Sequence, residues 1–322
     1  MKKEEIIKVL QQQDSTVLSF PDRGPWGSNK YRGNCSGYIQ AFLIWKYRIT
    51  KMAELFAGSG TGSDVARDMG VGYIGADLNP NPPRDNIIGG IDALHSDVPD
   101  EFRGADLVFM HPPYGAEIRI PYAGSMYTDP TGDLSRCDLG QMQWNKFIKA
   151  LNTIVMKYYA AMDKGAYMGI LMGDVRRNGF HSMFTDIVKP GELQQVIIKK
   201  QNNYSSAGRS YTSRSFVPIE HEYIMVLKKI APYIINFQLP QSHQIDIRDS
   251  ESATWADVVY AVIKDKGRVS LPEIYASIEG HKKCQRNPHW REKIRQTLQQ
   301  YAIFISTERG IWQAAAKCYR NN

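Results

Sequence analysis

The chain has 322 residues, enough for one large domain and one small domain, each with its own core. Its longest apolar runs, such as residues 166–172, are too short to span a bilayer, and the N-terminus lacks the apolar stretch of a secretory signal, so we expect a cytoplasmic protein without membrane contacts. The formal net charge of +7 permits a polyanionic partner but does not require one.

The apolar periodicity predicts helices that alternate with strands along most of the chain. We expect helices over residues 1–14, 37–47, 63–69 and 143–163, and a loop over 15–36. We expect strands over 51–56, 73–76, 107–110 and 167–172, and a terminal pair of strands at 196–200 and 223–227. This alternation indicates an α/β fold with a mainly parallel sheet.

The C-terminal part of the chain has a different pattern. We expect helices over 254–264, from Ser270 onward and over 289–300, with Pro272 in the first turn of the second helix, and then a hairpin over 304–312. Three helices and a hairpin indicate a helix-turn-helix variant. The predicted domains are therefore 1–237 and 252–322, joined by a linker over 238–251.

A glycine-rich turn follows the strand predicted at 51–56. Gly58, Gly60 and Gly62 would let main-chain N–H groups approach a ligand closely, although a purely structural turn is the alternative for the glycines alone. No lysine follows them, which excludes a P-loop. Asp77 ends the next strand, where a carboxylate can bind both ribose hydroxyls, and Asp92 follows the third segment, where it could meet an adenine amino group.

The tetrapeptide His111-Pro112-Pro113-Tyr114 follows the strand at 107–110. Two prolines make a stiff turn, in which the Pro112 carbonyl is a preorganised acceptor for an N–H group, and Tyr114 offers a face on which a base can stack. Neutral His111 could accept an N–H but its imidazolium could not, so we expect activity to fall below about pH 6.5. A structural turn with an exposed tyrosine is the alternative.

These two motifs, in this order, resemble motifs I and IV of the S-adenosylmethionine-dependent amino-methyltransferases of DNA, which modify adenine N6 or cytosine N4. Motif IV of that family begins with Asp, Asn or Ser, whereas this chain has His111. The aromatic loop at 20–34 precedes the glycine turn as motif X does, and residues 173–177 and 221–226 resemble later stretches of such enzymes.

The resemblance implies a Rossmann-like methyltransferase fold with a mostly parallel seven-stranded sheet, S-adenosylmethionine as cofactor and a flipped base as acceptor. The implied cofactor-binding residues are Glu54, Phe56, Ala57, Gly58, Gly60, Asp77 and Asp92. The implied catalytic residues are His111, Pro112, Pro113 and Tyr114.

The C-terminal residues resemble a winged-helix module of restriction-associated proteins, on Trp255, Ile274, Tyr275, Trp290, Gly310, Ile311 and Trp312. The resemblance implies double-stranded DNA as partner and a companion restriction endonuclease, although a protein-binding or purely stabilising module is the alternative. Its basic residues Lys282, Lys283, Arg286 and Arg291 are candidates for DNA contacts. The acid-free loop at 202–214 could contact phosphates through Arg209 and Arg214.

We interpret the chain as a DNA methyltransferase that modifies an exocyclic amino group, with adenine N6 favoured over cytosine N4. We do not expect a C5-cytosine enzyme, because such an enzyme needs a nucleophilic Cys, usually after Pro, and no Pro-Cys pair occurs. An RNA amino-methyltransferase and a catalytically silent DNA-binding regulatory protein are the alternatives. His281, Cys284 and His289 lack a convincing fourth ligand for a closed zinc site, so no metal is expected.

Overall fold

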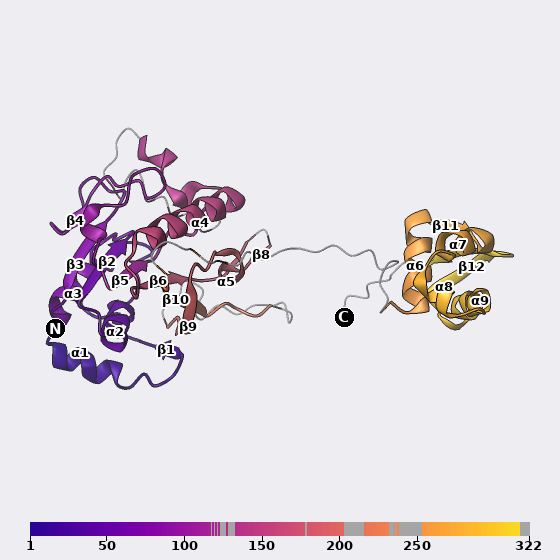
Figure 1. Cartoon of the computed structure of the whole chain (residues 1–322), viewed down its shortest axis with the longest axis horizontal. Coiled ribbons are helices and arrows are strands. Elements are labelled where there is room, and N and C mark those ends of the chain that lie inside the picture. The colour runs from indigo at the N-terminus through magenta and orange to yellow at the C-terminus, as the bar shows by residue number, and fades with distance from the viewer. Residues whose placement is uncertain are drawn as a thin grey trace. The chain divides into compact units, whose positions relative to one another are not determined.

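The computed structural model describes residues 1–116, 118, 120, 122, 127, 133–177, 179–202, 216–231, 235, 237 and 253–315. The chain divides into two compact units, Met1–Pro240 and Gln241–Asn322 (Figure 1). Residues 238–251, the expected linker, lie outside the described residues.

The first unit is built on a sheet of eight strands among its described residues, in the order β1-β9-β10-β6-β5-β2-β3-β4 (Figure 1). Strand β10 runs antiparallel to β6 and β9, and the other pairs of this sheet are parallel. This topology confirms the predicted α/β class with a mostly parallel, Rossmann-like sheet. The strands are β1 (Val17–Ser19), β2 (Lys51–Leu55), β3 (Gly72–Ala76), β4 (Ile87–Ile88), β5 (Leu107–Met110), β6 (Tyr167–Met172), β9 (Glu192–Lys200) and β10 (His221–Lys228).

The sheet has one strand more than the seven that we expected. Strand β1 lies in the stretch predicted as a loop, and Val17 pairs in parallel with Ile198 of β9. Leu18 is fully buried while Val17 is exposed, so one side chain anchors the strand. Three residues are too few for a periodicity to be detected, and tertiary pairing with β9 decides their conformation.

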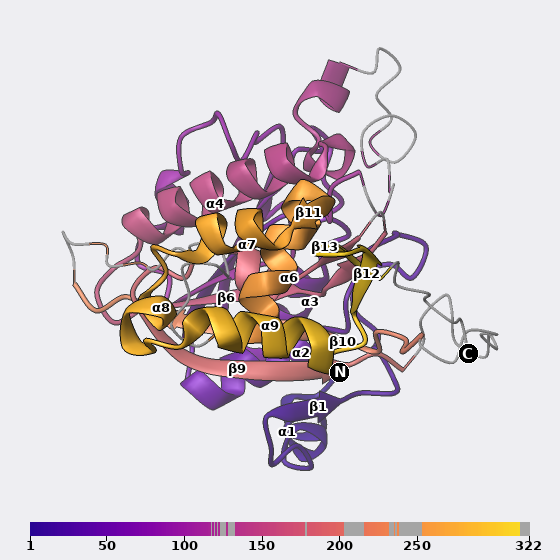
Figure 2. The same cartoon turned by 90° about the vertical axis from the view of Figure 1, so that its right-hand side faces the viewer.

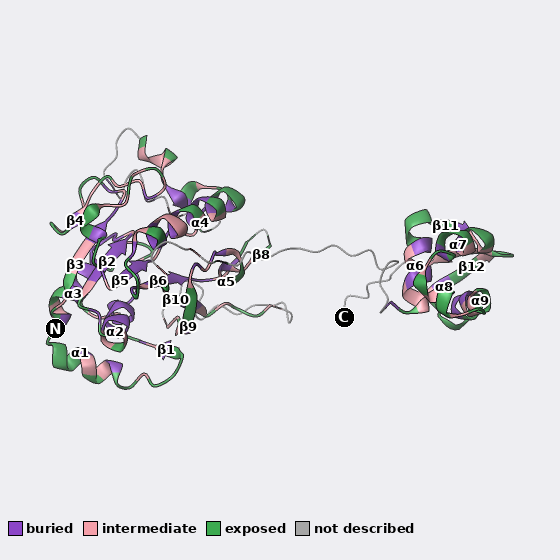
Figure 3. Ribbon diagram, viewed as in Figure 1, coloured by how far each residue is buried: buried purple, intermediate pink, exposed green. Residues whose placement is uncertain are grey.

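Helices cover both faces of the sheet (Figures 1 and 2). The helices α1 (Lys3–Leu10), α2 (Gly37–Tyr47) and α3 (Thr61–Met69) contribute to one apolar core, and α4 (Trp144–Ala161) and α5 (Met183–Asp186) contribute to the other. Consecutive residues of β5 divide between these cores, because side chains alternate across a strand. Both faces are covered, so the central strand β5 is apolar and buried throughout (Figure 3).

Short elements connect the main helices and strands of the first unit. They are the 3-10 helices η1 (Asp100–Phe102), η2 (Asp133–Arg136) and η3 (Leu139–Gln141). Strands β7 (Val175–Arg176) and β8 (Phe180–His181) form a separate antiparallel pair after β6. None of these was predicted, since each is too short to carry a periodic pattern.

The second unit contains four helices and three strands among its described residues. The helices are α6 (Trp255–Lys266), α7 (Leu271–Ile278), α8 (Lys282–Arg286) and α9 (Trp290–Gln300). The strands β11 (Arg268–Ser270), β12 (Phe304–Glu308) and β13 (Ile311–Ala314) form an antiparallel sheet in the order β11-β13-β12. Helix α7 begins where a helix was predicted to start; Ser270 is its N-cap, and the Ser270 backbone N–H donates to Glu273.

No helix among the described residues is long and apolar enough to cross a membrane. In the same part of the chain, no three His, Cys, Asp or Glu side chains gather where they could hold a metal ion.

Candidate functional site

The glycine-rich turn connects the end of β2 to the start of α3. Its backbone has positive φ at Phe56 (65°), Gly58 (51°) and Gly60 (79°). A residue with a side chain rarely adopts this conformation, which costs about 1–3 kcal/mol, and such strain gathers at functional sites. Phe56 therefore occupies a strained position at the point where the chain leaves the sheet.

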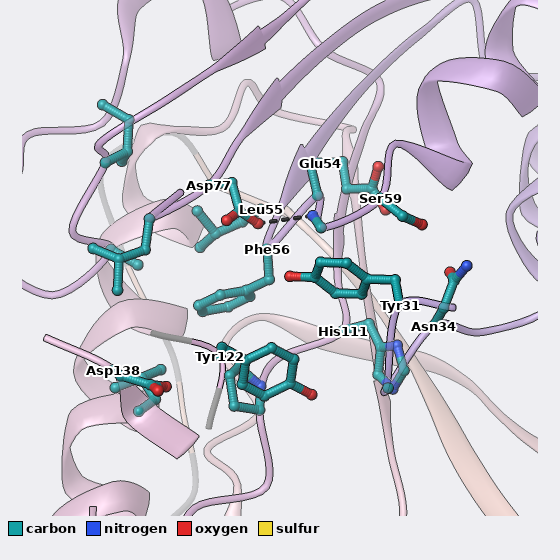
Figure 4. A pocket seen from close by; sticks show the side chains of 18 of the residues that line it. Tyr31, Asn34, Glu54, Leu55, Phe56, Ser59, Asp77, His111, Tyr122 and Asp138 are labelled. Atoms are coloured by element: carbon teal, nitrogen blue, oxygen red, sulfur yellow. Dashed lines mark hydrogen bonds between the residues drawn. The ribbon is translucent and has the colours of Figure 1, made fainter. Parts of the chain in front are cut away.

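Asp77 holds this turn from the neighbouring strand. The Gly58 N–H donates to Asp77 Oδ2 over 2.7 Å (Figure 4), and the Asn79 N–H donates to Asp77 Oδ1 over 2.9 Å. The carboxylate is buried, and burial raises its pKa. The end of β3 and the glycine turn are thus one rigid structure around a buried acid.

A cavity lies beside this structure, and we call it the glycine-loop cavity. It encloses about 800 Å³ of empty space, including its open mouth. Of the predicted cofactor-binding residues, it is lined by Glu54, Phe56, Ala57, Gly58, Asp77 and Asp92. Gly60 is not among its lining residues. It packs against Arg84 so closely that a Cβ at this position would lie 2.7 Å from Arg84 Cγ.

Glu54 is buried under the glycine turn and has two side-chain partners. The Gln40 amide N–H and the Tyr73 hydroxyl donate to its carboxylate, the latter over 2.5 Å. Burial raises the pKa of Glu54 to about 8, although both hydrogen bonds oppose the shift. Gln40 Oε1 is buried and has no hydrogen-bond partner among the described residues, so the cavity wall contains an unsatisfied acceptor.

Asp92 lines the glycine-loop cavity and also organises its own turn. Its Oδ1 accepts the Leu94 N–H over 2.9 Å, and its Oδ2 lies 2.7 Å from His95 Nδ1. Burial alone would raise the pKa of Asp92, but hydrogen bonds from His95 and Cys137 outweigh it and lower the pKa.

A second cavity, which we call the Tyr114 cavity, encloses about 1360 Å³ including its open mouth. Tyr114 lines this cavity and Pro113 lines the glycine-loop cavity. His111 lines both. Pro112 is buried and lines neither cavity, so contact between its carbonyl and a ligand stays a prediction.

His111 follows the last residue of β5, and its ring stands edge-on to Tyr114 with 6.1 Å between the ring centroids. Burial lowers the pKa of His111 to about 4, with Lys199 adding to the shift and Glu222 opposing it. The imidazole is therefore neutral throughout the ordinary pH range. The expected titration near pH 6.5 was wrong, because the sequence did not show how far the ring is removed from water.

Tyr114 is held by its hydroxyl group. This hydroxyl donates to Glu222 Oε1 over 2.6 Å and accepts the Gly173 N–H over 2.9 Å. Glu222 lies in β10 and also forms an ion pair with Lys199 of β9. Burial would raise the pKa of Glu222, but Lys199 outweighs it and holds the pKa at about 2.

None of the predicted nucleic-acid-binding residues that the structure describes lines either cavity. Lys282, Lys283 and Arg286 are in α8, and Arg291 is at the start of α9, where it lies over the rings of Trp290 and Tyr275. Arg209 and Arg214 lie outside the described residues.

Gln40 and Lys199 are cavity residues that the sequence analysis missed. Gln40 is the polar residue in a buried run of helix α2, residues 37–44, and that contrast could have identified it. Lys199 lies in a strand with mixed polarity and gave no such signal. Tyr31 and Asn34, from the loop that we compared with motif X, border the glycine-loop cavity (Figure 4).

No family model and no curated protein matches this chain. Solved structures of similar shape include TrmN from Thermus thermophilus, with 11% identity, a TM-score of 0.36, and coverage of 62% of this chain and 50% of that one. A precorrin-6y C5,15-methyltransferase from Geobacter metallireducens has 14% identity, a TM-score of 0.34, and coverage of 67% and 100%. The N-methyltransferase NodS from Bradyrhizobium japonicum has 8% identity, a TM-score of 0.32, and coverage of 60% and 96%.

This chain thus spans about half the length of TrmN, and 58% of Streptomyces venezuelae DesVI. At such low identities and TM-scores, these likenesses carry no argument about the activity. The chemistry of the site follows from its own geometry.

Proposed function

We propose that the first unit is an S-adenosylmethionine-dependent methyltransferase that acts on an exocyclic amino group of a base in DNA. The observation that carries this proposal is the position of His111, which lines the glycine-loop cavity on one side and the Tyr114 cavity on the other. A methyl donor in the first cavity and a base in the second would meet beside this residue.

The lining of the glycine-loop cavity suits the proposed cofactor. Asp77 offers a buried carboxylate at the end of β3, the position from which ribose hydroxyls are bound in nucleotide-binding α/β sheets. The unsatisfied Gln40 Oε1 suits the ammonium group of a methionine moiety. When bound, the cofactor supplies a methyl group on an electrophilic sulfonium centre.

The Tyr114 cavity suits a planar base with an amino group. Because the Tyr114 hydroxyl is already engaged by Glu222 and Gly173, the phenol offers a base its ring face. Neutral His111 can accept an N–H of the amine. A base in a duplex would have to leave the stack to reach this cavity.

We further infer that the second unit is a winged helix that binds DNA. Its order of helix, strand, three helices and terminal hairpin supports this, since the three-helix core and wing of such modules follow the same order. Lys282 and Arg286 are exposed, as is Arg291 of α9, and exposed cations are the side chains that contact phosphates in complexes with DNA.

Adenine N6 is the first acceptor proposed, and cytosine N4 is the second. Without its open mouth, the Tyr114 cavity has a volume of about 480 Å³, which leaves room for a purine. Mass spectrometry of nucleosides from duplex DNA or RNA incubated with labelled S-adenosylmethionine would identify the acceptor. Labelled N6-methyladenosine from RNA alone would overturn the proposal that DNA is the acceptor.

The competing function is that of a catalytically silent DNA-binding protein. It is favoured by His111, which stands where motif IV of the family has Asp, Asn or Ser. Calorimetry with S-adenosylhomocysteine tests the cofactor site separately from turnover. Failure of the full chain to bind this ligand would overturn the methyltransferase proposal. Binding without methylation of any nucleic acid would favour the silent protein.

A further inference from the structure

Four side chains from separate segments meet at the wall of the Tyr114 cavity. His111 and Tyr114 follow β5, while Lys199 and Glu222 come from the paired strands β9 and β10. In the register of these strands Glu222 lies opposite Lys199, so the sheet itself brings the two charges together. Each of the four residues lines the cavity proposed to hold the base.

Glu222 is the centre of this cluster. One carboxylate oxygen accepts the Tyr114 hydroxyl at 2.6 Å, and the other contacts the Lys199 ammonium. Side-chain exposure is 9% for Glu222 and 15% for Lys199, so the pair is largely shielded from solvent. A buried ion pair is a poor source of stability, since desolvation offsets most of its attraction, and its retention here calls for another explanation.

We propose that the Lys199–Glu222 ion pair positions the Tyr114 ring and offsets the negative charge that Glu222 places in the same cavity wall as His111. This inference rests on the proposed function, because it assigns the pair to the acceptor side of that reaction. Glu222 and Gly173 together fix the phenol oxygen from two directions, which restricts rotation of the ring. Lys199 cancels the charge that Glu222 would otherwise present to His111.

The electrostatics of the cluster agree with this assignment. Burial is the largest cause of the lowered His111 pKa, Glu222 opposes it, and Lys199 supports it. Without the ammonium, the carboxylate would raise the pKa of His111 and extend upward the pH range in which an imidazolium, which cannot accept the N–H of an amine, is present. The Cys35 thiol, whose pKa burial raises to about 12, also lines this cavity and is uncharged. The other charged or titratable side chains that line it are Arg23, Tyr122, Asp174, Lys200 and His221.

The charge effect can be measured without turnover. NMR titration of the full chain with labelled histidine would follow His111 among the seven histidines, with His111→Asn to assign its signal. We expect Lys199→Met to raise the His111 midpoint by about one unit or more, and Lys199→Arg to leave it near that of the wild type. An unchanged midpoint in Lys199→Met would overturn the role of Lys199.

The positioning effect needs kinetics on the acceptor. Glu222→Leu should lower kcat/KM for the base about 10-fold or more, whereas Glu222→Gln keeps an acceptor for the Tyr114 hydroxyl and should lose less. Tyr114→Phe in a Glu222→Leu background should cost little more, because the hydrogen bond is already absent. If the double variant loses as much kcat/KM as the Glu222→Leu and Tyr114→Phe losses combined, the positioning role of Glu222 would be overturned.

Binding of S-adenosylhomocysteine serves as the folding control, since neither Glu222 nor Lys199 lines the glycine-loop cavity. If Glu222→Leu does not bind S-adenosylhomocysteine, the double-mutant comparison is repeated with Glu222→Gln in its place, again combined with Tyr114→Phe. A wild-type protein that methylates no base would overturn the proposed function, while the His111 titration would still decide whether Lys199 controls its protonation.

Discussion

Tyr114 and Glu222 are separated by 108 residues in sequence and share a hydrogen bond of 2.6 Å. This bond joins the turn after β5 to β10, the antiparallel strand of the sheet. The Pro-Pro-Tyr turn is therefore held from a second element, and the ring of Tyr114 has a defined orientation at the edge of the Tyr114 cavity.

The first prediction concerns this ring. Tyr114→Ala should lower the rate of methyl transfer about 10- to 100-fold, because stacking of a base on an aromatic side chain contributes about 1–3 kcal/mol. Single-turnover kinetics measure the loss. Affinity for S-adenosylhomocysteine, measured by calorimetry, should be unchanged. A large drop would mean that the cofactor, and not the base, occupies the Tyr114 cavity.

The second prediction concerns Asp77. Asp77→Asn should weaken binding of S-adenosylhomocysteine about 10-fold or more, since hydrogen bonds to a charged group contribute about 1.5–3 kcal/mol. Calorimetry gives the affinity. Asp22→Asn, at an exposed residue of the first unit that does not line the glycine-loop cavity, is the matched control. Equal affinities in both variants would remove Asp77 from the proposed site.

The third prediction follows from the pKa of Glu54, which burial raises from 4.5 to about 8. Between these values the folded protein holds a proton that the unfolded chain releases, so the free energy of unfolding contributed by Glu54 falls as pH rises through this window. Glu54→Gln should remove that loss. Melting temperatures from pH 5 to 9 test it, with exposed Glu4→Gln as control; identical pH profiles for wild type and Glu54→Gln would refute it.

The fourth prediction concerns His111. Because its pKa is about 4, we expect no loss of activity from its protonation between about pH 5.5 and 8. His111→Asn should retain turnover within about 10-fold, since an amide oxygen can accept the same N–H, whereas His111→Ala should lose more. Rates for the three proteins at pH 7.5 decide this, and equal rates in His111→Ala and wild type would exclude the accepting role.

The fifth prediction concerns α8. Replacing Lys282, Lys283 and Arg286 together by Ala should weaken binding to duplex DNA. It should also reduce the slope of log binding constant against log salt concentration by about 0.9 for each phosphate that the variant no longer neutralises. Fluorescence anisotropy between about 50 and 200 mM salt measures both. A charge-matched control replaces Lys2, Lys3 and Lys8 of the first unit, and the same slope in both triple variants would argue against α8.

Regular elements with long apolar patterns could be predicted from the sequence. Helix α2 has the predicted bounds of residues 37–47, and strands β5 and β6 also match their predicted ranges. Burial dictates these patterns along contiguous residues, so local sequence contains the information. Strands β1, β4, β7, β8 and β11 were missed, because two or three residues depend on a pairing partner that is distant in sequence.

Within the candidate site, the contiguous motifs could be identified and their environments could not. The glycine turn, Asp77 and the Pro-Pro-Tyr turn follow directly from residue order and strand ends. Lys199 and Glu222 meet only because β9 and β10 pair, and the low pKa of His111 depends on burial that several segments create together.

The amino-acid sequence by itself determined the alternating α/β pattern and the order of the two motifs, because both are properties of neighbouring residues. Tertiary structure alone decided that His111 borders both cavities, that it stays neutral, and that Glu222 holds Tyr114. Those relationships depend on desolvation and on contacts across the sheet, and neither quantity is encoded in any short stretch of the chain.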